Sequence, residues 1–271
     1  DVVDQIKAQI ERDQRQNARM KRDIADQKDK INFFAHKGGK MRKLASKMRD
    51  SVEEAESNKV DVRQEDKTIG SFTIGISECT KPLVEITSLT VMKDHKPTTQ
   101  KVQVTVRKKH RLLITGPNGI GKSTLLEAMA GKTEQGAIIP PEVKVGYYRQ
   151  DFSGLDMQKT VYDTLAEVME MPDHQKIYAT ASHFLLKGDK VKNVVGNLSE
   201  GQKGLLCFAR FVLLQPTLLI LDEPTNHINF RHLPVIAQAL NKFEGGMILV
   251  SHDDEFVSQI TMNEELNLGT L

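Results

Sequence analysis

A glycine-rich octapeptide carries the strongest chemical signal in this sequence. Residues 116–123 read Gly-Pro-Asn-Gly-Ile-Gly-Lys-Ser and match the pattern G-x-x-x-x-G-K-[ST] in full. An apolar stretch, 112–115, precedes the loop, and a helix-forming stretch, 124–128, follows it. The glycines let backbone N–H groups wrap a phosphate at a helix N-terminus. The pattern therefore predicts a phosphate loop that holds a nucleotide.

The side chains at the end of this loop have separate expected roles. Lys122 should reach the β- and γ-phosphates, and the Ser123 hydroxyl should ligate Mg²⁺. The residues that we expect to bind the nucleotide here are Gly116, Pro117, Asn118, Gly119, Ile120, Gly121, Lys122, Ser123 and Thr124.

Two adjacent carboxylates supply the second half of the predicted site. Four apolar residues, 218–221, form a predicted buried strand that ends in Asp222 and Glu223. We expect Asp222 to hold Mg²⁺, directly or through water, and Glu223 to polarise the attacking water. Such a pair about a hundred residues after a complete phosphate loop predicts nucleotide hydrolysis rather than an ordinary strand end.

Three further motifs complete a family resemblance. Gln150, in Gly-Tyr-Tyr-Arg-Gln-Asp, resembles the Q-loop glutamine of ATP-binding cassettes. Residues 198–202, Leu-Ser-Glu-Gly-Gln, resemble the cassette signature, and residues 251–253, Ser-His-Asp, resemble the switch histidine. With five motifs in this order, residues 82–257 resemble an ATP-binding cassette ATPase, which implies ATP and Mg²⁺ as cofactors.

The resemblance also assigns roles to individual side chains. It gives catalytic roles to Glu223, His252 and Gln150, and metal contacts to Ser123, Gln150 and Asp222.

The resemblance further implies a second cassette as a partner. Ser199, Gly201 and Gln202 would then cap the γ-phosphate of ATP bound by that partner, because a helix N-terminus attracts anions. In this scheme ATP joins the two cassettes and hydrolysis releases them.

Residues 223–227, Glu-Pro-Thr-Asn-His, resemble the ABC-F family in particular. Its members have two cassettes, no membrane domain and a long basic two-helix linker between the cassettes. Residues 1–66 resemble that linker. The resemblance implies ribosome binding, with the linker tip near tRNA or the peptidyl-transferase region, and an effect on translation or antibiotic sensitivity.

The pattern of residues 1–57 independently predicts helix. Ten positions from Val3 to Phe34 step by three and four alternately, and seven of them are apolar, as in a coiled-coil seam. Gly38 and Gly39 should break this helix, and an apolar stripe resumes after them, which predicts an antiparallel two-helix coiled coil. Because the second helix is about half as long as the first, the first half of the first helix has no local partner. Either it packs on something outside this chain or, as we favour, the chain is a fragment that begins inside a helix.

Charge is concentrated in the same segment. Residues 1–50 hold 14 Lys/Arg and 8 Asp/Glu, a net charge of +6 within a chain of net charge +2. This asymmetry predicts a polyanionic partner for the segment, although a solvated helix face explains the charge equally well. Together with the family resemblance, it implies ribosomal RNA or tRNA as that partner.

The rest of the chain predicts an α/β cassette domain, residues 67–271, after a hairpin linker, residues 1–66. Helical segments alternate with short apolar segments, which favours a largely parallel sheet. The predicted strands are 72–76, 83–86, 102–106, 112–115, 143–148, 218–221 and 247–250.

The composition excludes some classes of protein. No run approaches the roughly 20 apolar residues of a membrane helix, and the first residues do not resemble a signal peptide. The two cysteines, Cys79 and Cys207, form no close-spaced pair, so we expect a reducing, cytoplasmic location.

The sequence departs from the family pattern in three places. Glu200 replaces the first glycine of the signature pair, where its charge would lie near a partner's γ-phosphate. Asn229 stands where many relatives have Asp. No aromatic residue lies between positions 84 and 104 to stack on adenine, so Met92 or His95 is left for that role.

Three rival functions remain open. They are the ATPase subunit of a membrane transporter, a coiled-coil ATPase of DNA repair, and a scaffold cassette without hydrolysis. The basic hairpin and its position before the cassette disfavour the first two, and the complete set of catalytic side chains disfavours the third.

Overall fold

The structure is a computed structural model, and it describes residues 68–78, 82–93 and 96–271. These residues all lie in the second of the two units into which the chain divides, Thr68–Leu271. The predicted hairpin linker, its coiled-coil seam and its basic tip lie outside the described residues, as does His95.

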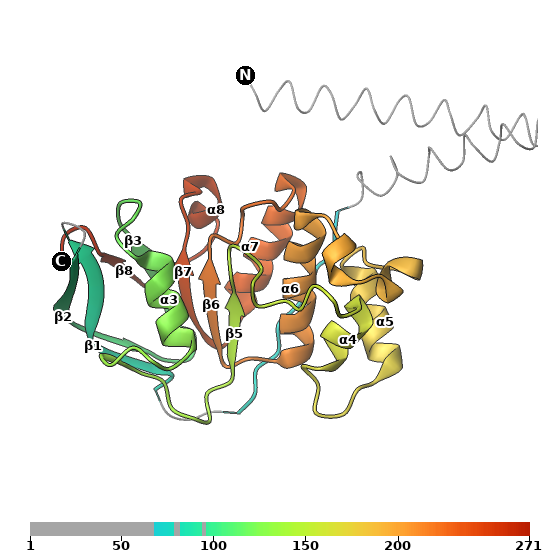
Figure 1. The fold of residues 1–271 in the computed structure, drawn as a ribbon, viewed down its shortest axis with the longest axis horizontal. Helices are drawn as coiled ribbons and strands as arrows, with labels where there is room; N and C mark the ends of the chain where they lie inside the picture. Colours follow the sequence, from blue (N-terminus) through green and yellow to red (C-terminus); the bar gives the residue numbers. More distant parts are fainter. Residues whose placement is uncertain (1–67, 79–81, 94–95) are drawn as a thin grey trace, which may run out of the picture. The chain divides into compact units, whose positions relative to one another are not determined.

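A five-stranded parallel sheet forms the centre of the cassette domain (Figure 1). Each of its strand pairs is parallel, and the strand order is β5-β6-β7-β3-β8. This arrangement confirms the predicted α/β class with a parallel sheet. The strands are β3 (Arg111–Thr115), β5 (Val145–Tyr148), β6 (Leu218–Asp222), β7 (Gly246–Val250) and β8 (Glu264–Asn267).

A smaller antiparallel sheet lies beside it, with the strand order β2-β1-β4. Its long hairpin, β1 and β2, approaches the phosphate loop, because the Met92 N–H donates to the Ile120 carbonyl at 2.9 Å. The strands are β1 (Val84–Lys93), β2 (Lys96–Val106) and β4 (Ala137–Ile138).

Helices follow the strands, and α4, α5 and α6 gather beyond the β5 edge of the parallel sheet (Figure 1). The α-helices are α3 (Lys122–Ala130), α4 (Val161–Ala166), α5 (His174–His183), α6 (Glu200–Leu214), α7 (Leu233–Lys242) and α8 (Asp254–Ser258). Short 3₁₀ turns are η1 (Gly188–Lys192), η2 (Val195–Asn197) and η3 (Phe230–His232).

The parallel sheet separates two apolar cores, because successive side chains of a strand point to opposite faces. Along β6, Leu219 and Leu221 pack with α6 and α7, whereas Leu218 and Ile220 pack with α3 and the antiparallel sheet. All five residues of β6 are buried, as the unbroken apolar run predicts for a central parallel strand.

One predicted strand is wrong. Residues 72–76 alternate apolar and polar side chains, yet they form no strand. Their apolar residues instead cover helices: the Phe72 ring lies 4.9 Å from that of Phe184 and 6.3 Å from that of Phe208. An alternating pattern shows that every second side chain is buried, but it does not show that the backbone pairs in a sheet. Here a segment outside any sheet buries its alternate apolar side chains against helices.

Candidate nucleotide site

The phosphate loop occupies the turn between β3 and α3. Three of its glycines have positive φ angles: 143° at Gly116, 81° at Gly119 and 98° at Gly121. Side chains rarely adopt this backbone region, so the loop shape itself requires glycine there. Gly121 is also the N-cap of α3 and supplies no side-chain hydrogen bond to the helix. The N–H groups of the first turn of α3 therefore remain available to an anion.

Lys122 folds back over this loop. Its Nζ atom donates to the carbonyl of Gly116 at 2.8 Å and to that of Pro117 at 3.1 Å. The side chain is largely buried, with 9% of its residue surface exposed. An ammonium group held in this position lies next to the N-terminus of α3, and both groups favour an anion there.

The carboxylate of Asp222 ends β6 within reach of the phosphate loop. The Ser123 hydroxyl donates a hydrogen bond to it, while its Oδ1 atom is buried and has no partner. Burial raises the pKa of this carboxyl, the Ser123 bond opposes the rise, and the neighbouring charge of Glu223 adds to it. A buried carboxylate with a free oxygen beside a hydroxyl fits a hard cation such as Mg²⁺.

Glu223 follows in a left-handed conformation, with φ 47°. Its N–H donates to the Val250 carbonyl at 2.9 Å, and its Oε2 atom accepts the backbone N–H of His252 at 3.1 Å. The Oε1 atom is buried without a hydrogen-bond partner and lies 3.6 Å from His252 Nε2. One oxygen is thus fixed to the backbone, and the other can accept a proton.

Segments far apart in the sequence meet at one cavity of about 720 Å³, the nucleotide cavity. Its lining includes most of the predicted site: Asn118, Gly119, Gly121, Lys122, Ser123, Thr124, Gln150, Asp222, Glu223 and His252. Met92 also lines it, which places this residue beside the phosphate loop.

Two lining residues were not predicted from the sequence. Asn226 and Val250 both face the nucleotide cavity. Asn226 lies in segment 223–227, whose motif carries the family resemblance, so its place in that motif could have marked it as a site residue. Val250 is an ordinary strand residue, so nothing in the sequence marks it.

The predicted signature residues do not line this cavity. Ser199 is the N-cap of α6, and it forms a capping box with Gln202. The Gln202 N–H donates to Ser199 Oγ at 3.3 Å, and the Ser199 N–H donates to Gln202 Oε1 at 3.1 Å. Gly201 packs closely, since an added Cβ would lie 2.9 Å from the His227 carbonyl oxygen.

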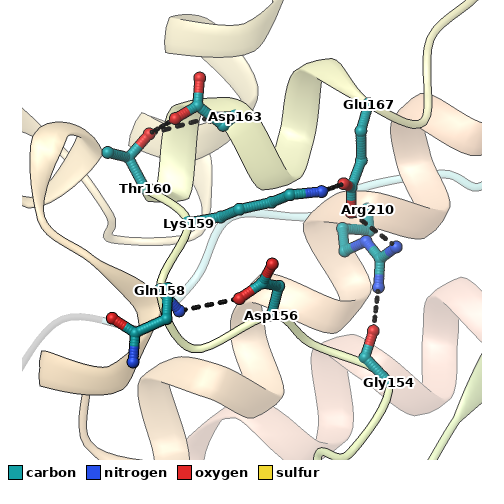
Figure 2. Close-up of polar contacts among 8 residues, drawn as sticks. All are labelled: Gly154, Asp156, Gln158, Lys159, Thr160, Asp163, Glu167 and Arg210. Atoms are coloured by element: carbon teal, nitrogen blue, oxygen red, sulfur yellow. Dashed lines mark hydrogen bonds and ion pairs between the residues drawn. The ribbon is translucent and has the colours of Figure 1, made fainter.

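A polar network joins the segment after Gln150 to the signature helix (Figure 2). Arg210 of α6 donates to the Gly154 carbonyl at 3.3 Å and pairs with Glu167 at 3.2 Å. Lys159 reaches the other oxygen of Glu167 at 2.5 Å. Glu167 therefore bridges one cation from the segment after Gln150 and one from α6.

Backbone hydrogen bonds extend the same connection. The Val195 N–H donates to the Lys159 carbonyl at 2.8 Å, and the Gly196 N–H donates to the Met157 carbonyl at 3.0 Å. Thr160 caps α4 by accepting the Asp163 N–H at 3.1 Å (Figure 2). The chain between Gln150 and α4 is thereby tied to η2, which leads directly into the signature.

Comparison of the sequence with known proteins identifies its family. Residues 99–226 match the model described as ABC transporter. The chain is 28% identical over 249 residues to the probable ATP-binding protein YbiT of Escherichia coli O157:H7, covering 90% of this chain and 47% of YbiT. It is 30% identical over 256 residues to ATP-binding cassette sub-family F member 2 of Mus musculus, covering 88% and 39%. The chain belongs to the ABC-F family of ATP-binding cassette proteins.

Solved structures share the fold. A putative ABC transporter ATP-binding protein of Pyrococcus furiosus aligns with a TM-score of 0.54 at 22% identity, over 69% of this chain and 98% of that one. A model of ribosome-bound archaeal Pelota and ABCE1 aligns with a TM-score of 0.52 at 20% identity, over 73% and 34%. ATP-binding cassettes are ATPase domains, so the described unit is the nucleotide-binding domain of an ATP hydrolase family.

The chain spans less than half the length of these two curated relatives. Among the helices that the structure describes, none is long and apolar enough to cross a membrane.

Proposed function

We propose that this ABC-F chain binds Mg·ATP in the nucleotide cavity and hydrolyses its γ-phosphate. One observation carries the proposal: four separate segments converge on that cavity and supply a phosphate loop, two carboxylates, a glutamine and a histidine. The N-terminus of α3 and Lys122 hold the β- and γ-phosphates, because both offer positive charge in a largely buried setting.

Glu223 is the proposed general base. Its unpartnered Oε1 takes a proton from water as the water oxygen bonds to the γ-phosphorus, and the bond to the bridging oxygen breaks to leave ADP. His252, 3.6 Å from that oxygen, would hold the water and contact the γ-phosphate. Ser123, Gln150 and Asp222 would hold Mg²⁺, which neutralises developing charge on the phosphates.

The complete site is proposed to need a second cassette. Ser199, Gly201 and Gln202 lie at the N-terminus of α6, outside the cavity that holds the other motifs. A helix N-terminus stabilises an anion only within about its first turn. These residues would therefore serve ATP bound by a partner, and the partner's signature would close the cavity described here.

The 271-residue chain should consequently bind ATP but hydrolyse it slowly as a monomer. Specific activity should rise with protein concentration where the chain associates with itself, because each association completes a site. The measurement is phosphate release across a concentration series, with the oligomeric state followed by sedimentation. High activity per chain in a verified monomer, unchanged on dilution, would contradict the shared site.

We further propose that the protein acts on ribosomes in the cytoplasm, with residues 1–66 as a basic hairpin linker and residues 67–271 as the cassette. Support comes from the net charge of +6 in residues 1–50, from the ABC-F relatives, and from the fold shared with a structure of ribosome-bound ABCE1 and Pelota. Ribosomal RNA or tRNA is the proposed partner, since Lys/Arg side chains release counterions when they contact phosphates.

Replacing four cations of the predicted tip, Lys37, Lys40, Arg42 and Lys43, with alanine should weaken ribosome association and flatten its salt dependence by up to about four units of slope. The measurement is co-sedimentation of the Glu223→Gln chain with ribosomes across a salt series. A control carries four alanines at exposed cassette lysines, Lys96, Lys187, Lys192 and Lys242. Equal binding and equal slopes for the parent and the tip variant would remove the RNA contact from the proposal.

A further inference from the structure

The acidic residue within the signature has a partner in its own cassette. Glu200 is the first residue of α6, and its Oε2 atom lies 2.7 Å from Nδ1 of His227. Both side chains are partly exposed, 62% for Glu200 and 43% for His227. The Glu200 carboxylate is therefore directed toward the segment that follows Asp222 and Glu223.

His227 occupies a costly backbone conformation at this contact. Its φ angle is 68°, in the left-handed region that glycine and asparagine tolerate best. Its ring lies 6.2 Å from that of Phe152, in the segment after Gln150, and it lines a cavity of about 390 Å³ together with Ser123 and Asp222. Strained residues of this kind persist where surrounding contacts over-determine them, commonly at functional sites.

The position of Glu200 creates an electrostatic conflict. The signature end of α6, residues 199–202, is the part that the proposed function assigns to a partner's γ-phosphate. A carboxylate on the first residue of the helix is attracted to the same N–H groups and repels a second anion. A charge turned aside and hydrogen-bonded to an imidazole interferes less than one that is free to approach the helix axis.

We propose that His227 is a positioning residue for the signature end: it holds the Glu200 carboxylate aside, so that α6 can receive a nucleotide phosphate from a second cassette. The inference rests on the proposed shared site and adds a specific device to it. It also accounts for a glutamate at a position that would otherwise repel the ligand.

The test measures Mg·ATP-dependent self-association of the chain by sedimentation velocity, in a Glu223→Gln parent that preserves ATP. His227→Gly removes the side chain without adding strain at positive φ, and it should weaken association about two- to fivefold, the scale of one exposed charge interaction. His227→Asn keeps a donor near the position of Nδ1 and tolerates the backbone, so its association should stay close to that of the parent.

Removal of the conflicting charge should abolish the need for His227. Adding Glu200→Gly or Glu200→Gln to His227→Gly should restore association to at least the parental level. Urea unfolding of each variant reports whether the fold is intact, and His227→Asn supplies a folded comparison if the glycine variant is unstable.

Each outcome decides between two claims. If His227→Gly binds its partner as tightly as the parent, or if its defect persists without Glu200, the positioning role is wrong while the shared site stands. If the parent itself shows no Mg·ATP-dependent association at any concentration, a second copy of this chain does not complete the site, and this inference is wrong for that pairing.

Discussion

Replacing Lys122 with alanine is expected to lower the affinity for Mg·ATP by at least about 100-fold, because charge-assisted hydrogen bonds to two phosphates contribute about 3 kcal/mol or more. No other cation in the phosphate loop can replace it. In the described structure Lys122 lies over the loop, with bonds of 2.8 Å and 3.1 Å to two loop carbonyls, so the loop itself positions this charge.

Isothermal calorimetry checks this loss, and Lys132→Ala is the matched control. Lys132 follows α3, and its Nζ atom donates to the carbonyl of Pro140 at 3.0 Å, away from the nucleotide cavity. The control should keep parental affinity. If Lys122→Ala also keeps it, residues 116–123 do not hold the phosphates in the proposed way.

Changing Glu223 to glutamine should leave ATP bound and reduce turnover by about two orders of magnitude or more, the scale for loss of a general base. The amide retains the shape of the carboxylate and can still accept the His252 N–H, which Oε2 accepts at 3.1 Å. The opposite end loses its capacity to take a proton, so the chemical step is affected more than binding.

Single-turnover hydrolysis with saturating protein separates that step from product release. Glu170→Gln, an exposed change between α4 and α5, is the control and should hydrolyse ATP at the parental rate. A rate near wild type in Glu223→Gln would show that another group activates the water. Slow hydrolysis combined with lost ATP binding would instead indicate a damaged cavity.

These experiments test different steps of the proposed mechanism. The Lys122→Ala variant tests whether the loop binds phosphate, and the Glu223→Gln variant tests the chemical step on a bound nucleotide. The concentration series tests whether one cassette is enough. The Glu200 and His227 variants test whether His227 prevents the Glu200 charge from weakening association of two cassettes. This test applies only if the shared site is correct.

Much of the site was predictable from short segments. A phosphate loop needs glycine at positive φ angles, a strand before it and a helix after it, and all three requirements fall within residues 112–128. The buried strand that ends in Asp222 and Glu223 is similarly local, because five consecutive buried residues form a central parallel strand.

Strand predictions failed where the burial of side chains and the hydrogen bonding of the backbone do not coincide. Residues 72–76 have a strand-like pattern but cover α5 and α6 without joining a sheet. Conversely, β8 has the sequence Glu-Glu-Leu-Asn and pairs with β3 at the edge of the sheet. An edge strand with exposed polar side chains carries little apolar pattern, so its pairing partner decides its conformation.

The sequence by itself determined the chemistry of the site: which groups hold phosphate, which carboxylates follow the buried strand, and which family the motifs resemble. Those properties follow from residue types at short spacing. Only the tertiary structure decided that Lys122 folds onto its own loop, that Glu167 joins Lys159 to Arg210, and that Glu200 faces His227. The last of these pairs joins residues 27 positions apart, and no local pattern encodes a contact that depends on how the N-terminal end of α6 packs against the segment after β6.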